Sequence, residues 1–144
     1  MATVLTTTAQ DKPLWLRFPA ISPDGQLIAF SYKGDLFTVP VGGGLAHQLT
    51  TNAAYDACPV WSPDGTKIAW LSMERDGYEA DKTRLMVADV IFKESPDGQA
   101  GNPSVLNIKD LTSSFKYNAA GPLWSADSKG IYFNALVEIG RAHV

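Results

Sequence analysis

The chain has 144 residues, 45% of them hydrophobic and 19% charged, with a formal net charge of −3. This composition is typical of a globular protein, and the length suits a single domain. The sequence has neither a basic block nor an apolar run long enough for a membrane span, so we expect no nucleic-acid partner and no membrane partner. A single cysteine, Cys58, excludes an internal disulfide, and we expect it to be a small buried residue.

Residues 1–13 have no basic start and no full apolar core of the kind found in a signal peptide. Two interpretations stay open for this stretch. It is either a disordered N-terminus or the remnant of a signal peptide cleaved after Ala9, and the second alternative predicts a periplasmic or secreted protein.

Three segments of the chain share one pattern, in which a proline and a short apolar stretch lead into a turn and a second apolar stretch leaves it. They are Pro19–Phe30, Pro59–Trp70 and Pro122–Phe133. The turn residues Ser-Pro-Asp-Gly suit a tight turn, because proline presets φ, aspartate caps the turn and glycine adopts a positive φ. Each segment therefore predicts a β-hairpin.

The outgoing strands of these hairpins are apolar on both faces, as in Leu27–Phe30. This predicts a strand that lies between two sheets, since a strand with one face in water would alternate apolar and polar residues. The motif serines Ser22 and Ser62 lie 40 residues apart, and Ser125 follows after 63 more. A period near 40 is typical of a four-stranded propeller blade, and the longer second interval indicates an insertion.

The remaining strands complete the first two units. The first unit has a predicted third strand, a tight turn and a predicted fourth strand at Asp35–Val41, Gly42–Gly44 and Leu45–Thr50. In the second unit the third and fourth strands are predicted at Arg84–Val90 and Val105–Thr112. Between them, Ser95–Gly98 resembles the repeat but no apolar strand follows it, so an extended hairpin loop is predicted there.

The sequence thus predicts an all-β fold, a partial β-propeller of about two and a half four-stranded antiparallel blades, over residues 14–137. The blades are predicted at about 14–52, 55–112 and 118–137. Residues 138–144 are set apart, because Ile139–Val144 matches the translation of a common sequencing adapter. Our hypothesis is that this tail is not native and that the chain is a truncated fragment.

The repeated segments resemble the blade motif of TolB, tricorn protease and the prolyl oligopeptidase family, roughly Trp-Ser-Pro-Asp-Gly-Lys-x-Ile-Ala-Phe. The first unit departs from this motif at Ile21, and the third departs at Ala126 and Ser128. Outside the motif, two sets of residues narrow the resemblance. Leu14–Phe18 resembles tricorn-like secreted peptidases. A longer set resembles dipeptidyl and acylaminoacyl peptidases of the prolyl oligopeptidase family, and it consists of Trp70–Leu85, Asp110–Thr112 and Phe115–Asn118.

The longer set favours the prolyl oligopeptidase family. This resemblance implies the N-terminal propeller of a secreted serine peptidase that gates peptide access to a C-terminal α/β-hydrolase domain missing from this sequence. It implies two partners, the peptide substrate of the parent enzyme and that catalytic domain, and no cofactor. Two alternatives stay open: the propeller of a tricorn-like peptidase, or a non-catalytic TolB-like propeller that binds a protein.

No catalytic residue and no metal ligand set is predicted within the chain, which has no Gly-x-Ser-x-Gly elbow. We expect His47 to be a surface residue on an outer strand, and we expect Ser22, Ser62 and Ser125 to stabilise their turns. This chain alone is therefore expected to be inactive.

The polar connection 74–82 is the one candidate for specificity, and its candidate substrate-binding residues are Glu74, Arg75 and Glu79. The glutamates are suited to hold the α-ammonium group of a peptide through charge-assisted hydrogen bonds. The alternative is a solvated connector held by internal Arg–Asp pairs, which contribute little energy.

Overall fold

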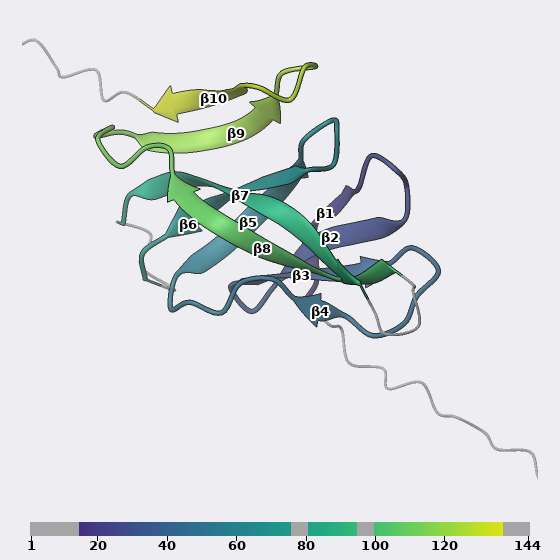
Figure 1. Ribbon diagram of the computed structural model, residues 1–144. Coiled ribbons are helices and arrows are strands. Elements are labelled where there is room, and N and C mark those ends of the chain that lie inside the picture. Colours follow the sequence, from purple (N-terminus) through teal and green to yellow (C-terminus); the bar gives the residue numbers. More distant parts are fainter. Residues whose placement is uncertain (1–14, 76–80, 95–99, 137–144) are drawn as a thin grey trace, which may run out of the picture.

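The computed structural model describes residues 15–75, 81–94 and 100–136 (Figure 1). All secondary-structure elements in these ranges are β-strands. The strands form three antiparallel sheets, ordered β1-β2-β3-β4, β5-β6-β7-β8 and β10-β9. Their bounds are β1 Arg17–Ile21, β2 Leu27–Tyr32, β3 Asp35–Pro40, β4 His47–Gln48, β5 Tyr55–Trp61, β6 Lys67–Met73, β7 Thr83–Glu94, β8 Ala100–Asp110, β9 Asn118–Trp124 and β10 Ile131–Leu136.

The three sheets lie one against the next in chain order (Figure 1). Strand β5 contacts β1, β2 and β3, and strand β9 contacts β5, β6 and β7. Consecutive strands pair within each sheet, and each new sheet covers the face of the sheet before it. This arrangement confirms the predicted fold class, an all-β partial β-propeller.

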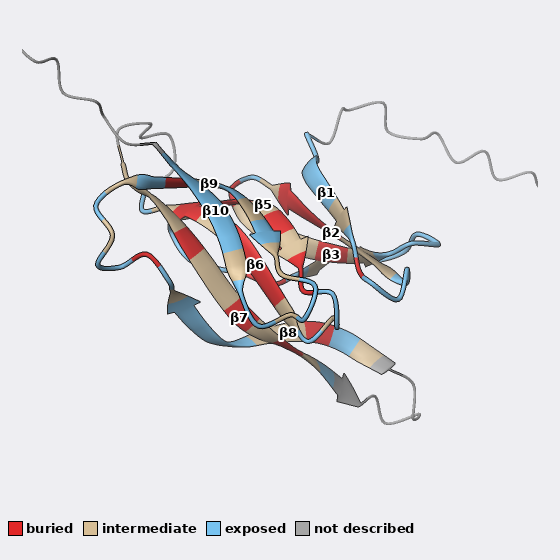
Figure 2. Cartoon of the chain, turned by 90° about the horizontal axis from the view of Figure 1, so that it is seen from above, coloured by how far each residue is buried: buried red, intermediate tan, exposed pale blue. Residues whose placement is uncertain are grey.

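Two apolar clusters hold the sheets together. Between the first and second sheets, the buried residues are Ala29, Leu36, Leu49, Trp61, Ile68, Trp70, Ala88 and Val90. Between the second and third sheets, a smaller cluster contains Ala69, Leu85 and Ala119. Buried positions follow the middles of the central strands, while much of β10 is exposed (Figure 2). The chain therefore has one strong joint between sheets and one weaker joint.

A β-bulge recurs in the first strand of every sheet and was not predicted from the sequence. Phe18, Cys58 and Gly121 each precede a proline, and their φ angles are +54°, +54° and +55°. The strand register shifts at each of these places. Such a bulge bends a strand and increases its twist, which suits strands that must follow one another around an axis.

The prediction for Cys58 was only partly right. The residue is half-buried rather than fully buried, and it lies at the bulge of β5 with a φ of +54°. Burial raises the pKa of its thiol, which therefore stays protonated near neutral pH.

The outer strands differ in length from the predicted ones. Strand β4 has only two residues, His47 and Gln48, although the backbone N–H of Leu49 also donates to the carbonyl of Leu36 at 2.7 Å. Strands β7 and β8 continue past the edge of β6 as a paired two-stranded arm, because each supplies the other's hydrogen bonds there. The region of Ala100–Pro103, predicted as loop, thus belongs to β8, while Ser95–Gly98 lies outside the described residues.

Within the described ranges, no helix is long and apolar enough to cross a membrane.

Candidate functional site

The connection between β6 and β7 leaves the sheet at Met73 and returns at Thr83. It lies at one end of the strands. The Ser-Pro-Asp-Gly turns, which join β1 to β2 and β5 to β6, lie at the opposite end of the strands. Of the three candidate residues, Glu74 and Arg75 are described and exposed, and Glu79 lies outside the described residues. The structure therefore places two of the three next to each other at the start of the connection.

Arg75 is engaged by the far side of its own connection. Its Nη2 lies 2.6 Å from Oδ1 of Asp81, and its Nε donates to Oδ2 of Asp81 at 2.8 Å. This two-point contact lowers the pKa of the Asp81 carboxyl, chiefly through the hydrogen bond from Arg75. Arg75 thus closes the base of the connection, as the alternative interpretation of an Arg–Asp connector expects.

The returning side of the connection is tied to two other elements. Nζ of Lys82 donates to the carbonyl of Thr112 at 2.5 Å, and the backbone N–H of Thr83 donates to Oδ1 of Asn118 at 2.9 Å. Thr112 follows β8 and Asn118 begins β9, so the connection is fixed at the joint between the second and third sheets. Two carboxylates of the connection lie within the described residues. Asp81 pairs with Arg75, and Glu74 is exposed.

A second polar cluster lies at the same end of the strands and was missed by the sequence analysis. Asp56 is fully buried, and its backbone N–H donates to the carbonyl of Gly34 at 2.7 Å, which brings it beside Asp35. Oδ2 of Asp35 accepts from Gln48 at 2.9 Å, and Oδ2 of Asp56 accepts from Asn52 at 3.2 Å.

The other carboxylate oxygen of each aspartate is buried and accepts no hydrogen bond from the described residues. Burial, and then the nearby charge of Asp56, raise the pKa of Asp35. In the sequence, each of these aspartates is an acidic residue at the end of an apolar strand. One sequence alone does not distinguish such a residue from a solvated charge.

The motif serines act inside their turns. The hydroxyl groups of Ser22, Ser62 and Ser125 donate to the aspartates two residues later at 2.5, 2.7 and 2.6 Å. Each hydroxyl oxygen also accepts a backbone N–H five residues later at 2.9 Å. These contacts occupy the hydroxyl groups in turn formation, the role that was expected for them.

The turn aspartates are stabilised as anions by the same contacts. The backbone N–H of Thr66, with the hydroxyl groups of Ser62 and Thr66, lowers the pKa of Asp64 to about 2. For Asp24 and Asp127 the hydrogen bonds from Ser22 and Ser125 likewise lower the pKa. Hydrogen bonds to the charged form are the cause in all three turns.

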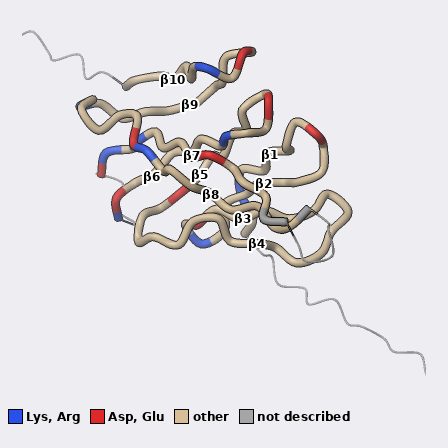
Figure 3. Tube along the Cα trace, viewed as in Figure 1, with Lys and Arg blue, Asp and Glu red and all other residues tan. Residues whose placement is uncertain are grey.

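Charged residues are spread over several turns and strand ends rather than gathered in one patch (Figure 3). Among the residues that the structure describes, no three His, Cys, Asp or Glu side chains come together as a metal site. His47 is half-buried on β4, the outer strand of the first sheet. The polar connection with Glu74 therefore remains the candidate site.

Comparison with known proteins supports a peptidase relationship. No protein-family model matches the chain. The chain is 38% identical over 130 residues to dipeptidyl-peptidase 5 of Porphyromonas gingivalis, a match that covers 81% of this chain and 17% of that protein. It is also 43% identical over 65 residues to tricorn protease homolog 1 of Streptomyces coelicolor, a match that covers 45% of this chain and 6% of that protein.

A solved TolB structure from Agrobacterium tumefaciens superimposes with a TM-score of 0.47 at 21% identity, over 86% of this chain and 55% of that one. The chain spans less than a fifth of the length of the two curated relatives named above. The sequence matches confirm the resemblance to peptidases stated above: the chain is similar to parts of a dipeptidyl-peptidase and of a tricorn protease homolog.

Proposed function

We propose that this chain is the propeller portion of a serine peptidase of the dipeptidyl-peptidase type, and that the propeller controls which peptides reach the catalytic domain. The observation that carries the proposal is the 38% identity to a dipeptidyl-peptidase 5 along 81% of a chain that folds as stacked blades. Blades arranged around an axis enclose a passage, and the width of such a passage limits entry to extended chains. Short peptides would pass and folded proteins would be excluded.

A chimera tests this role. The segment of the Porphyromonas gingivalis enzyme that matches this chain would be replaced by this chain's own residues, and circular dichroism would confirm folding. We expect the chimera to release dipeptides from short peptides and to leave a folded protein substrate intact. A folded chimera that degrades the folded protein would contradict the gating role, and a folded chimera without dipeptide release would contradict the assignment to this peptidase type.

Within this function we propose that Glu74 and Glu79 bind the α-ammonium group of the peptide. Support comes from Glu74, which is exposed beside Arg75, whereas Asp81 already pairs with that arginine. A carboxylate in this position is able to accept charge-assisted hydrogen bonds from an ammonium group. Glu74 and Glu79 changed together to Gln in the chimera should raise KM for free-N-terminus peptides about tenfold, with little change for peptides that have a blocked N-terminus.

The matched control is Glu94→Gln, at the far end of β7 and at the opposite edge of the sheet. This control should leave both KM values unchanged. An equal KM for the double variant and the control would remove the glutamates from the site while leaving the gating proposal intact.

The match to a tricorn protease homolog supports a second candidate, a tricorn-like peptidase propeller. That match covers less of the chain than the dipeptidyl-peptidase match, so we rank it second. The coding sequence downstream separates the two, because a Gly-x-Ser-x-Gly elbow followed by Asp and His belongs to an α/β-hydrolase. A periplasmic or secreted location is part of both proposals, and mass spectrometry of the mature N-terminus would test it through cleavage after Ala9.

A further inference from the structure

Asp35 and Asp56 come together at the first joint, where the second sheet packs on the first. Asp35 begins β3, and the carbonyl of Gly34, directly before it, accepts the backbone N–H of Asp56 at 2.7 Å. The carbonyl of Asp56 in turn accepts the hydroxyl of Ser31 at 2.8 Å. Burial, and then the charge of Asp56, raise the pKa of Asp35, so the two carboxylates lie within electrostatic reach of each other.

Each of these carboxylates has one oxygen with a partner and one without. The Oδ2 atoms accept side-chain amides, from Gln48 at 2.9 Å and from Asn52 at 3.2 Å. Both Oδ1 atoms are buried without a hydrogen-bond partner among the described residues, and Asp56 is 0% exposed. A buried carboxylate oxygen of this kind is costly, because it has lost its water and gained no replacement. Two of them at one place indicate that a positively charged group completes the site.

The described part of the protein does not itself supply that group. Neither of its salt bridges includes Asp35 or Asp56. The strand register brings one cation toward Asp56, because Asp56 pairs with Ser72 and Ser72 pairs with Arg84. The guanidinium of Arg84 donates to the hydroxyl of Ser72 at 3.4 Å, so its contact lies on β6, one strand away from Asp56. Nζ of Lys33 lies over a tyrosine ring, 5.3 Å from its centroid.

The acidic pair distinguishes the first joint from the second. Asp35 directly precedes a leucine whose N–H donates to a threonine hydroxyl, and the equivalent residue of the second sheet is Arg84. Asp56 lies two residues before the bulge of its strand, and the equivalent residue of the third sheet is Ala119. The repeat itself therefore does not require the two aspartates.

Both joints share a different bond nearer the Ser-Pro-Asp-Gly turns. Nε1 of Trp61 in β5 donates to the carbonyl of Ala20 in β1, and Nε1 of Trp124 in β9 donates to the carbonyl of Val60 in β5, each at 3.1 Å. These bonds fix the turn end of each joint. At the opposite end of the strands the first joint has the acidic pair, where a cation would join the two sheets.

We propose that Asp35 and Asp56 bind a divalent cation of the calcium type, which joins the first sheet to the second. Two carboxylates balance its charge, and calcium prefers oxygen ligands. Calcium also tolerates irregular geometry and completes its shell with backbone carbonyls and water, whereas magnesium demands a nearly ideal octahedron. This inference does not depend on the peptidase proposal, because it concerns the joint between two sheets and not the substrate.

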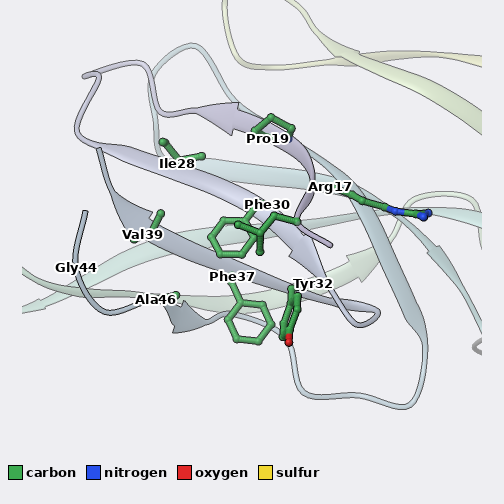
Figure 4. A pocket seen from close by; sticks show the side chains of 10 residues that line it. Arg17, Pro19, Ile28, Phe30, Tyr32, Phe37, Val39, Gly44 and Ala46 are labelled. Carbon is green, nitrogen blue, oxygen red and sulfur yellow. The ribbon is translucent and has the colours of Figure 1, made fainter. Parts of the chain in front are cut away.

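Terbium luminescence tests the site in the full chain, because Tb³⁺ takes the oxygen ligands of Ca²⁺ and emits when a nearby tyrosine is excited. Tyr32 pairs with Asp35 and lines the apolar cavity of about 570 Å³ on the outer face of the first sheet (Figure 4). Tyr55 directly precedes Asp56. Each proposed ligand thus has a tyrosine beside it that is able to excite a bound Tb³⁺ ion.

We expect saturable Tb³⁺ emission that Ca²⁺ displaces with a Kd of about 0.1–1 mM, and Mg²⁺ only at about tenfold higher concentration. Asp35→Asn and Asp56→Asn should each weaken binding by about tenfold or more, since each removes one of the two negative charges. The matched control is Asp89→Asn, an aspartate of the second sheet that pairs with Lys67, and it should leave the emission unchanged. Circular dichroism checks the folding of each variant, and Asp35→Asn, at a half-buried position, decides the test if Asp56→Asn does not fold.

Equal emission from the wild type and both variants would overturn the site, and so would no emission from the folded wild type. Loss of emission in only one of two folded variants would overturn the bridge, because it would assign the cation to a single carboxylate. Thermal unfolding gives a second measure: Ca²⁺ at ten times its Kd should raise Tm by about 4 °C in the wild type and the control, and by less than about 1 °C in either variant. An equal rise in all four proteins would place the calcium elsewhere.

Discussion

The two joints of this molecule use the same motif but differ in how much they bury. The first joint packs two complete four-stranded sheets and fully buries large side chains such as Ile68 and Trp70. The second joint packs the two strands β9 and β10 onto a complete sheet, and its buried residues are Ala69, Leu85 and Ala119. Each joint has its own tryptophan–carbonyl bond. The motif therefore sets the register of one blade on the next, while the number of strands sets the strength of the joint.

The largest expected difference between the joints is in apolar burial. Ile68→Ala should lower the free energy of unfolding by about 2–5 kcal/mol, because it leaves a cavity in a fully buried site. Leu123→Ala, on the uncovered face of β9, should change it by less than about 0.5 kcal/mol. Urea unfolding of the two variants measures both effects, and equal losses would contradict the exposed position of Leu123.

Next in size is the tryptophan–carbonyl bond itself. Trp61→Phe should cost about 1–2 kcal/mol, since Trp61 is 9% exposed and the carbonyl of Ala20 would lose its donor in a partly buried place. Trp124→Phe should cost less, about 0.5–1 kcal/mol, because water is able to replace the indole at the more open second joint. A double-mutant cycle would show whether the two bonds act independently.

A third test uses the bulge that precedes each proline. Gly121→Ala should cost about 1 kcal/mol, because an added Cβ would lie 3.1 Å from Nδ2 of Asn134 at a φ of +55°. Cys58→Ala, at the equivalent position of the second sheet, should be nearly neutral, because that position already accommodates a Cβ at a φ of +54°. Thermal unfolding compares them, and a large loss in Cys58→Ala would indicate that the thiol itself has a packing role.

The smallest expected effects are those of pH on two aspartates with opposite shifts. The folded pKa of Asp64 is about 2, below its ordinary 3.8, so Asp64 contributes stability that is present above pH 3.8 and is lost as pH falls toward 2. The pKa of Asp35 is raised, so its folded form holds its proton more strongly and stability falls as pH rises through the range above 3.8.

Stability against pH should separate these contributions. Asp64→Asn should reduce the loss of stability below pH 3.8, and Asp35→Asn should reduce the loss that begins above it. The measurement is the urea midpoint of each variant between pH 2 and pH 6. A pH profile unchanged by both substitutions would show that neither carboxyl group is coupled to folding.

Part of the candidate site was accessible from the sequence. The polar stretch after Met73 and the presence of a connector Arg–Asp pair follow from residue types in a gap between two apolar strands. The pairing of Arg75 with Asp81, and the attachment of Lys82 and Thr83 to Thr112 and Asn118, do not follow, since they depend on the neighbouring sheet. The half-buried Asp35 and the buried Asp56 were missed for the same reason, because they belong to neighbouring sheets and their burial depends on how those sheets pack.

The sequence by itself determined the hairpins, because proline, aspartate, glycine and serine specify a turn through local backbone preferences and short-range hydrogen bonds. The apolar faces of the outgoing strands also predicted cover on both sides, which the structure shows for β6, whereas much of β10 is exposed. Only the tertiary structure decided the bulge at Phe18, Cys58 and Gly121, the length of the β7–β8 arm and the indole bonds between sheets. The indole bonds join residues 41 and 64 positions apart, and the bulges and the arm depend on the register in which strands pair, for which one sequence has no local pattern.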